Sequence, residues 1–266
     1  MMYFLSVVLI GTVYPIFLDV ISSQKISVGP PFYHKLIAPF LIPFLFAMAI
    51  GPRLKWIRSD LKDKIYLISL LIISILISFF IVKNFSTNIL INTILISSAL
   101  YLFFITLRDF FSKKYKNFAQ NTAHFGFSLL ILSILFNNLF SSEIITNLKV
   151  GETYDNSKTK IVFESINQKK EKNYKSIIAN FNITNSEGIN NKLSPELRIY
   201  NQPNITTSEA DIKTTLMKDK FIVINLVQNQ DYFNVRYQVK PFMLWIWLSV
   251  IMISFGGLVS FLQKRI

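Results

Sequence analysis

The sequence predicts a membrane α-helical bundle of about six transmembrane helices, with a small antiparallel β domain inserted before the last helix. Of the 266 residues 52% are hydrophobic and the mean hydropathy is +0.42, which excludes an ordinary soluble domain. The apolar residues are gathered into separate runs of about 20, the length that crosses a bilayer. One polar stretch of roughly a hundred residues, the size of a small domain, interrupts these runs.

Six apolar segments are expected to span the membrane. The first begins at Met1 without a charged leading region, which indicates a span rather than a cleaved signal. The second is short and contains Pro39 and Pro43, so its lower end is expected to be irregular or tilted. The segments are Tyr3–Ile21, Leu36–Ile50, Ile65–Val82, Asn88–Leu107, Asn121–Phe140 and Phe242–Leu262.

Basic residues are divided unequally between the loops on the two sides. If the spans alternate, one side carries Arg53, Lys55, Arg58, Lys62, Lys64, Arg108, Lys113, Lys114, Lys116, Lys264 and Arg265, and the other only Lys25, Lys35 and Lys83. By the positive-inside rule the richer side faces the matrix or cytoplasm. Because orientation accounts for this charge, nothing indicates a nucleic-acid partner.

The polar region divides the chain into residues 1–140, a five-helix membrane region, residues 141–241, a β domain, and residues 242–266, the last helix with a short inner tail. The β domain is expected on the outer face, as an antiparallel barrel or sandwich. Runs of alternating, β-branched or aromatic residues predict the strands Lys160–Ile166, Ser176–Ile183, Glu196–Tyr200, Phe221–Val227 and Phe233–Val239. The region has no histidine, carboxylate pair or phosphate-binding glycine loop, so binding or scaffolding is its expected role.

His124 is the leading candidate for a functional residue. It lies near the start of the fifth span, and an ionisable residue inside a membrane helix marks a functional site by default. A neutral imidazole in a helix bundle can ligate haem iron, but it can equally well hydrogen-bond a neighbouring helix. Gly126, nearly opposite on the helix, would let another helix approach closely. His34, the one other histidine, follows a Gly-Pro-Pro turn at the membrane edge and is expected to be an interface residue.

Four stretches resemble the C-terminal part of CcmF, the haem lyase subunit of the System I cytochrome c maturation pathway. They are GTVYPIFLDVISSQKISVGPPFY (Gly11–Tyr33) continuing into PFLIPFLFAMAIGPRLKW (Pro39–Trp56), TAHFGFSLLILSI (Thr122–Ile134), LSPELRIYNQPNITTSEADI (Leu193–Ile212) and KPFMLWIWLSVIMISFGG (Lys240–Gly257). They occur in the family's order and cover nearly the whole chain.

The resemblance implies that His124 is one of two transmembrane axial ligands of the iron of a b-type haem. It implies a complex that attaches haem covalently to apocytochrome c, a holocytochrome c synthase in which this chain is not active alone. Because the helix starts from the inner loop, that haem would lie in the inner half of the bilayer, which favours electron transfer over direct attachment. Arg198 is a possible contact for a partner or a haem propionate, with a salt bridge to Glu196 or Glu209 as the alternative.

The sequence also departs from the family. The family's tryptophan-rich haem motif, its two external histidines and its upstream transmembrane histidine are absent, and the tryptophans present are Trp56, Trp245 and Trp247. This pattern is typical of the C-terminal piece of a split lyase in the mitochondrial inner membrane, with the bacterial plasma membrane as the alternative. The expected partners are an N-terminal CcmF-like subunit, a haem chaperone, apocytochrome c with its thiol-handling protein, and membrane lipid.

Two other functions remain open from the residues alone. An assembly scaffold that binds no haem differs from the lyase subunit only through His124. A transporter subunit, with Pro39 and Pro43 marking a broken helix, predicts an internal repeat and polar residues at mid-membrane. Apart from Asn92 and serines the spans contain neither, so this function is the least favoured.

Overall fold

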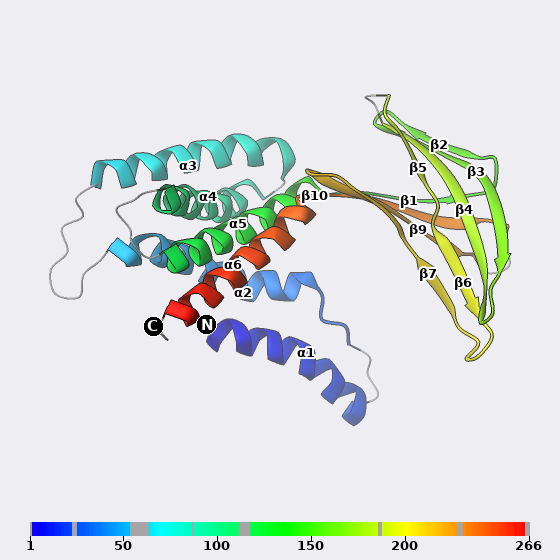
Figure 1. Cartoon of the computed structure of the whole chain (residues 1–266), viewed down its shortest axis with the longest axis horizontal. Coiled ribbons are helices and arrows are strands. Elements are labelled where there is room, and N and C mark those ends of the chain that lie inside the picture. The colour runs from blue at the N-terminus through cyan, green and yellow to red at the C-terminus, as the bar shows by residue number, and fades with distance from the viewer. Residues whose placement is uncertain are drawn as a thin grey trace. The chain divides into compact units, whose positions relative to one another are not determined.

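The computed structural model shows two compact units, one mostly of helices and one mostly of strands (Figure 1). The residues described are 2–22, 26–53, 64–86, 88–111, 118–185, 188–227 and 231–263. The helical unit consists of Met1–Leu135 and Ser249–Ile266, and the β unit is Phe136–Leu248.

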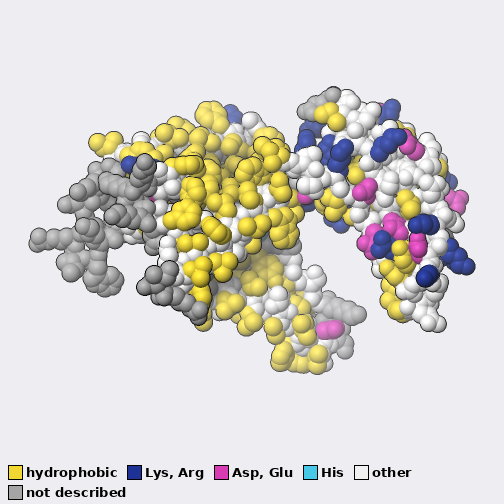
Figure 2. All heavy atoms as spheres, in the orientation of Figure 1, with side chains coloured by type: hydrophobic (Ala, Val, Ile, Leu, Met, Phe, Trp, Pro, Cys, Tyr) yellow, Lys and Arg dark blue, Asp and Glu magenta, His cyan; other side chains and the backbone are white. Residues whose placement is uncertain are grey.

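Within the described ranges, six helices are long and apolar enough to cross a membrane, which confirms the predicted number of spans. Figure 2 shows mostly hydrophobic side chains on the described part of the visible face of these helices, whereas Lys, Arg, Asp and Glu side chains are scattered over the β unit. The helices are α1 (Met2–Ser22), α2 (Pro30–Ile50), α3 (Lys64–Phe85), α4 (Ile89–Phe111), α5 (Phe118–Phe140) and α6 (Met243–Gln263).

The second span is longer than the sequence predicts. Helix α2 begins at Pro30, passes through Pro39 and Pro43 without ending, and runs into a 3-10 turn at Gly51–Arg53. The expected start at Leu36, and with it the short length of this span, is therefore wrong. Pro30 and Pro31 favour a helix start, because their missing N–H groups would have no helical partner there. Membrane helices also tolerate interior prolines, since surrounding groups can satisfy the freed carbonyls.

The β unit is an antiparallel sandwich of two sheets, one of the two architectures predicted. The first sheet has the strand order β1-β10-β9-β8, and the second has β2-β3-β4-β6-β7 with β5 also paired to β4. The strands are β1 (Ser142–Leu148), β2 (Thr153–Asn156), β3 (Thr159–Lys170), β4 (Tyr174–Asn185), β5 (Asn190–Leu193), β6 (Glu196–Tyr200), β7 (Thr206–Glu209), β8 (Asp211–Thr214), β9 (Lys218–Leu226) and β10 (Phe233–Pro241).

Aromatic residues from both sheets form the centre of the sandwich core. Phe163 of β3 stacks on Phe181 of β4 with ring centroids 4.4 Å apart, and Phe233 of β10 meets Phe163 edge-on at 5.6 Å. Tyr237 of β10 is only 2% exposed and belongs to the same cluster. The five predicted strands coincide with β3, β4, β6, β9 and β10, which supply most of this core.

The chain enters and leaves the sandwich at neighbouring points. Strand β1 pairs with β10 from Ser142 opposite Val239 to Leu148 opposite Phe233. The side-chain amide of Asn137, near the end of α5, donates a hydrogen bond of 2.5 Å to the carbonyl oxygen of Pro241, at the end of β10. This pairing explains how a domain of this size can be inserted between two membrane helices.

Candidate functional site

His124 lies in the second turn of α5, about 9 Å along the helix axis from its first residue, Phe118. Its side chain is half-buried. In the described part of the chain neither ring nitrogen has a hydrogen-bond partner, although the charge of Asp109 on α4 acts on the imidazole. Among the described residues, the helix–helix hydrogen bond that the sequence left open as an alternative does not occur.

Contacts on three sides fix the rotation of α5 around His124. The ring of Phe127 meets that of Phe44 on α2 at 6.0 Å, and the Ser128 hydroxyl lies 2.8 Å from the Thr106 hydroxyl on α4. His124 shares a helix face with Phe127 and Ser128, so this face is directed toward α2 and α4. Gly126 lies on the other side, where an added Cβ would be 3.0 Å from the backbone nitrogen of Ile253 on α6. The predicted close approach of a helix at Gly126 is confirmed.

A buried ion pair joins the helix ends near His124. A guanidinium nitrogen of Arg53 lies 2.6 Å from a carboxylate oxygen of Asp109, and the two side chains are only 10% and 13% exposed. Arg53 also donates to the carbonyl oxygen of Ala49 at 2.8 Å, and the Asn121 side chain donates to the carbonyl oxygen of Asp109 at 3.0 Å. These bonds hold the ends of α2 and α4 and the start of α5 together, one turn before His124.

Sequence reasoning missed the importance of Arg53 and Asp109. Arg53 was counted among the loop charges, and its partner lies 56 positions later in the chain. One signal was present, because Asp109 is the single acidic residue between Arg108 and Thr122, in a segment otherwise rich in lysine. An isolated carboxylate among bases at a helix end indicates an ion pair, although it does not identify the partner.

His34 is not brought near His124. His34 is exposed near the start of α2. Arg53, whose ion-pair partner Asp109 acts on His124, follows the end of the same helix. The 19 residue steps from His34 to Arg53 correspond to roughly 28 Å along a helix axis. The two histidines of this chain therefore cannot ligate one metal ion together, and among the described residues no group of three or more His, Asp or Glu side chains could hold one.

Arg198 lies on the second sheet of the sandwich, where it is paired with two carboxylates. Its guanidinium nitrogens are 3.0 Å from a Glu196 oxygen and 3.9 Å from a Glu209 oxygen, and its Cζ lies 5.2 Å from the ring centre of Tyr174. Its hydrogen bond to Glu196 lowers the pKa of that carboxyl and raises the pKa of Arg198 itself. A propionate or partner carboxylate would have to compete with these two glutamates for the guanidinium.

The groups around His124 have the chemistry that one side of a haem requires. An imidazole that has no hydrogen-bond partner among the described residues could take one axial position, and Phe127, one turn further along the same face, contacts Phe44 and makes that face apolar. Two guanidinium groups, Arg53 and Arg108, occur at the same end of the helices and suit carboxylate groups such as propionates. A haem held at this place would take one axial ligand, His124, from this chain.

The fold and site together define a class of protein: a multi-span membrane protein with His124 in its fifth span and a β-sandwich inserted before its last span. Residues 139–241 match the family model described as the CcmF C-terminal β-sandwich. The chain is related to the C-terminal part of the CcmF proteins, which confirms the resemblance seen in the sequence.

The similarity extends beyond the sandwich. The chain is 25% identical to the cytochrome c-type biogenesis protein CcmF of Pseudomonas fluorescens, over 98% of this chain and 42% of the relative. It is 24% identical to the CcmF protein of Escherichia coli (strain K12), over 97% of this chain and 41% of the relative. A solved structure titled Cytochrome c Heme Lyase CcmF superposes with a TM-score of 0.70 at 18% identity, over 96% of this chain and 43% of that chain, and shows the shared fold. The chain thus spans less than half the length of the relatives it matches.

Proposed function

We propose that this chain is the C-terminal part of a haem lyase, which attaches haem covalently to apocytochrome c, and that His124 is one axial ligand of a transmembrane b-type haem. The observation that carries the proposal is the half-buried imidazole of His124, whose nitrogens have no hydrogen-bond partner among the described residues. The names of the similar proteins, cytochrome c-type biogenesis protein CcmF and Cytochrome c Heme Lyase CcmF, support the assignment to this process.

The opposite axial ligand must come from outside this chain. His34 and His124 are the chain's two histidines, and roughly 28 Å of helix separates His34 from the ion pair beside His124. We infer that a separate N-terminal CcmF-like subunit supplies the second transmembrane histidine, together with the tryptophan-rich motif that this sequence lacks. The chain alone is then inactive, and the complex is the enzyme.

Each residue at the site has a separate task in this proposal. The imidazole of His124 donates a nitrogen lone pair to the iron, and the rings of Phe44 and Phe127 keep water away. Arg53 and Arg108 bring positive charge to the end of the helices where propionates would lie, with Asp109 offsetting part of it. A bound haem would supply one-electron transfer, whose potential depends on axial ligation, burial and nearby charge.

We propose that the basic loops face the matrix of a mitochondrion, or the cytoplasm of a bacterium, with the sandwich on the other side of the membrane. The eleven-to-three distribution of basic residues supports this orientation. The sandwich would then be placed to contact the haem chaperone, apocytochrome c and its thiol-handling protein. Arg198, at the centre of an ordered charged cluster, is the proposed contact for one of these partners.

The test compares His124→Ala with His34→Ala in the assembled complex. The quantity measured is b-type haem per complex, from pyridine haemochrome spectra of complexes purified through a tag on the other subunit. We expect the His124 variant to assemble, to lose its low-spin b-haem spectrum and to fail in cytochrome c maturation, while the His34 variant keeps its haem. Unchanged b-haem in the His124 variant would favour the scaffold that binds no haem.

A further inference from the structure

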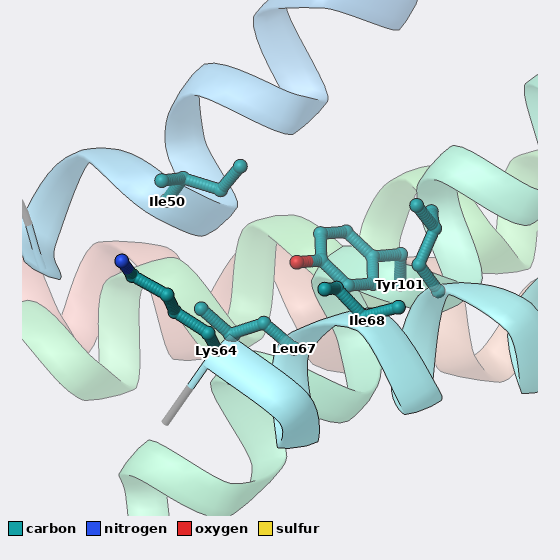
Figure 3. Close-up of a pocket in the computed structure, with 6 residues that line it drawn as sticks. Ile50, Lys64, Leu67, Ile68 and Tyr101 are labelled. Carbon is teal, nitrogen blue, oxygen red and sulfur yellow. The ribbon is translucent and has the colours of Figure 1, made fainter. Parts of the chain in front are cut away.

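A hollow of about 310 Å³ lies among α2, α3 and α4 in the helical unit (Figure 3). Most of its wall is one face of α3, since four of its lining residues are spaced i, i+3, i+4 and i+7 on that helix. This face extends about 10 Å along the helix axis. The lining residues are Ile50, Lys64, Leu67, Ile68, Leu71 and Tyr101.

The polar groups of the hollow are concentrated at one end. Lys64 is the first residue of α3 and its side chain is exposed, while Leu67, Ile68 and Leu71 continue the wall with hydrocarbon alone. Tyr101 is only 3% exposed, and no hydrogen bond of its hydroxyl occurs in the described part of the chain. Figure 3 shows this hydroxyl directed toward the side where Lys64 lies. The hollow is therefore an apolar slot with a cation, Lys64, at one end.

We propose that this slot binds one acyl chain of an anionic phospholipid, whose phosphate group pairs with the Lys64 ammonium. A lysine at the end of a spanning helix lies at headgroup depth, and the seven positions from Lys64 to Leu71 run from there into the hydrocarbon. A cation at one end of an apolar slot matches the charge and shape of an anionic lipid.

The same slot could take another apolar molecule of the membrane, such as an isoprenoid quinone. A quinone headgroup is neutral, so its binding would not depend on the charge of Lys64. Binding of an anionic lipid would depend on that charge, because the lipid phosphate pairs with the ammonium group. Removing the charge of Lys64 therefore distinguishes the two ligands experimentally.

The experiment uses the full chain, delipidated in detergent and titrated with dioleoyl phosphatidylglycerol or dioleoyl phosphatidylcholine, with bound lipid counted by native mass spectrometry. We expect phosphatidylglycerol to bind about fivefold more tightly, which corresponds to the ~1 kcal/mol that one basic residue contributes beside an anionic headgroup. Lys64→Gln should remove this preference. Lys83→Gln, an exposed lysine in the last turn of the same helix, should preserve it.

A second pair of variants tests the slot itself. Ile68→Trp fills the hollow and should reduce the tight binding of both lipids at least tenfold, whereas Ile73→Trp, on the opposite face of α3, should not. Binding that is equal for both headgroups in the unmodified chain, or unaffected by Ile68→Trp, would overturn the proposal. Displacement of the lipid by decylubiquinone with equal affinity in the unmodified and Lys64→Gln chains would replace it with a quinone site.

Discussion

Gly256 on α6 should be a position where a single methyl group disturbs the proposed haem site. A Cβ added there would lie 2.8 Å from the Ala119 carbonyl oxygen, 2.8 Å from the Ala123 backbone nitrogen and 3.0 Å from the Ala123 Cβ. Ordinary contacts begin at 3.4 Å, so α5 and α6 must separate by roughly half an ångström at this point. Backbone atoms cannot rotate away as a flexible side chain can, and Ala123 immediately precedes His124.

The expected magnitude for Gly256→Ala is the difference between two opposing effects. Overpacking costs about 1–3 kcal/mol, and replacing glycine by alanine in a helix regains about 1 kcal/mol. We therefore expect a loss of about 1 kcal/mol in the free energy of unfolding, together with a changed b-haem spectrum or a lower haem content. Gly257, whose added Cβ would meet nothing within 4 Å, provides the matched control.

The assay is detergent-induced unfolding of the complex, followed by circular dichroism, with haem absorbance recorded in the same samples. Gly257→Ala should leave both measurements unchanged or raise stability slightly. If the two alanine variants unfold at the same detergent fraction and carry the same haem spectrum, the close contact of α5 with α6 does not position His124.

Three further outcomes are expected. Asp109→Asn should destabilise the helical unit by about 3–5 kcal/mol, because it removes the carboxylate that offsets the buried charge of Arg53. Unfolding of the Asp109→Asn and Arg53→Gln single variants and of the combined variant measures the coupling between the two residues. The hydrogen bond from Arg198 lowers the pKa of Glu196 from 4.5 in the folded sandwich, so ionised Glu196 stabilises the fold above pH 4.5, and this stabilisation is lost as the pH falls through the lower pKa of the folded state. Hydrogen exchange of β4 and β6 should show the loss of protection at low pH, and Glu196→Gln should abolish this pH dependence. Arg198→Glu should impair maturation, and restoration by adding Glu196→Arg would assign Arg198 a structural role instead of a partner contact.

The number and position of the membrane helices could be predicted because the signal is local. A span needs about 20 apolar residues, and each run reveals itself without knowledge of its neighbours. The start of α2 was predicted wrongly. Residues 30–35 were assigned to a turn and loop at the membrane edge because of Gly29-Pro30-Pro31, whereas α2 begins at Pro30 and continues through Pro39 and Pro43.

The sandwich was predicted only as far as its strands carry a pattern of their own. Long strands such as β4 and β9 alternate buried and partly exposed residues, and that alternation is visible in the sequence. Five shorter or more polar strands (β1, β2, β5, β7 and β8) were missed. Strand β7, for example, consists of Thr206–Glu209 and is recognisable only through its pairing with β6. A single sequence does not contain such non-local pairing.

His124 could be identified because it is one of two histidines, but its surroundings could not. The Arg53–Asp109 pair joins residues 56 positions apart, and sequence reasoning had already assigned Arg53 to the basic loops that set orientation. The structure shows Arg53 to be only 10% exposed and paired with Asp109, which places it in the candidate site. Without it the charge comparison falls from eleven to ten basic residues, against three on the other side. The orientation argument survives this loss, so variants of Arg53 or Asp109 can probe the surroundings of His124 without inverting the helices in the membrane.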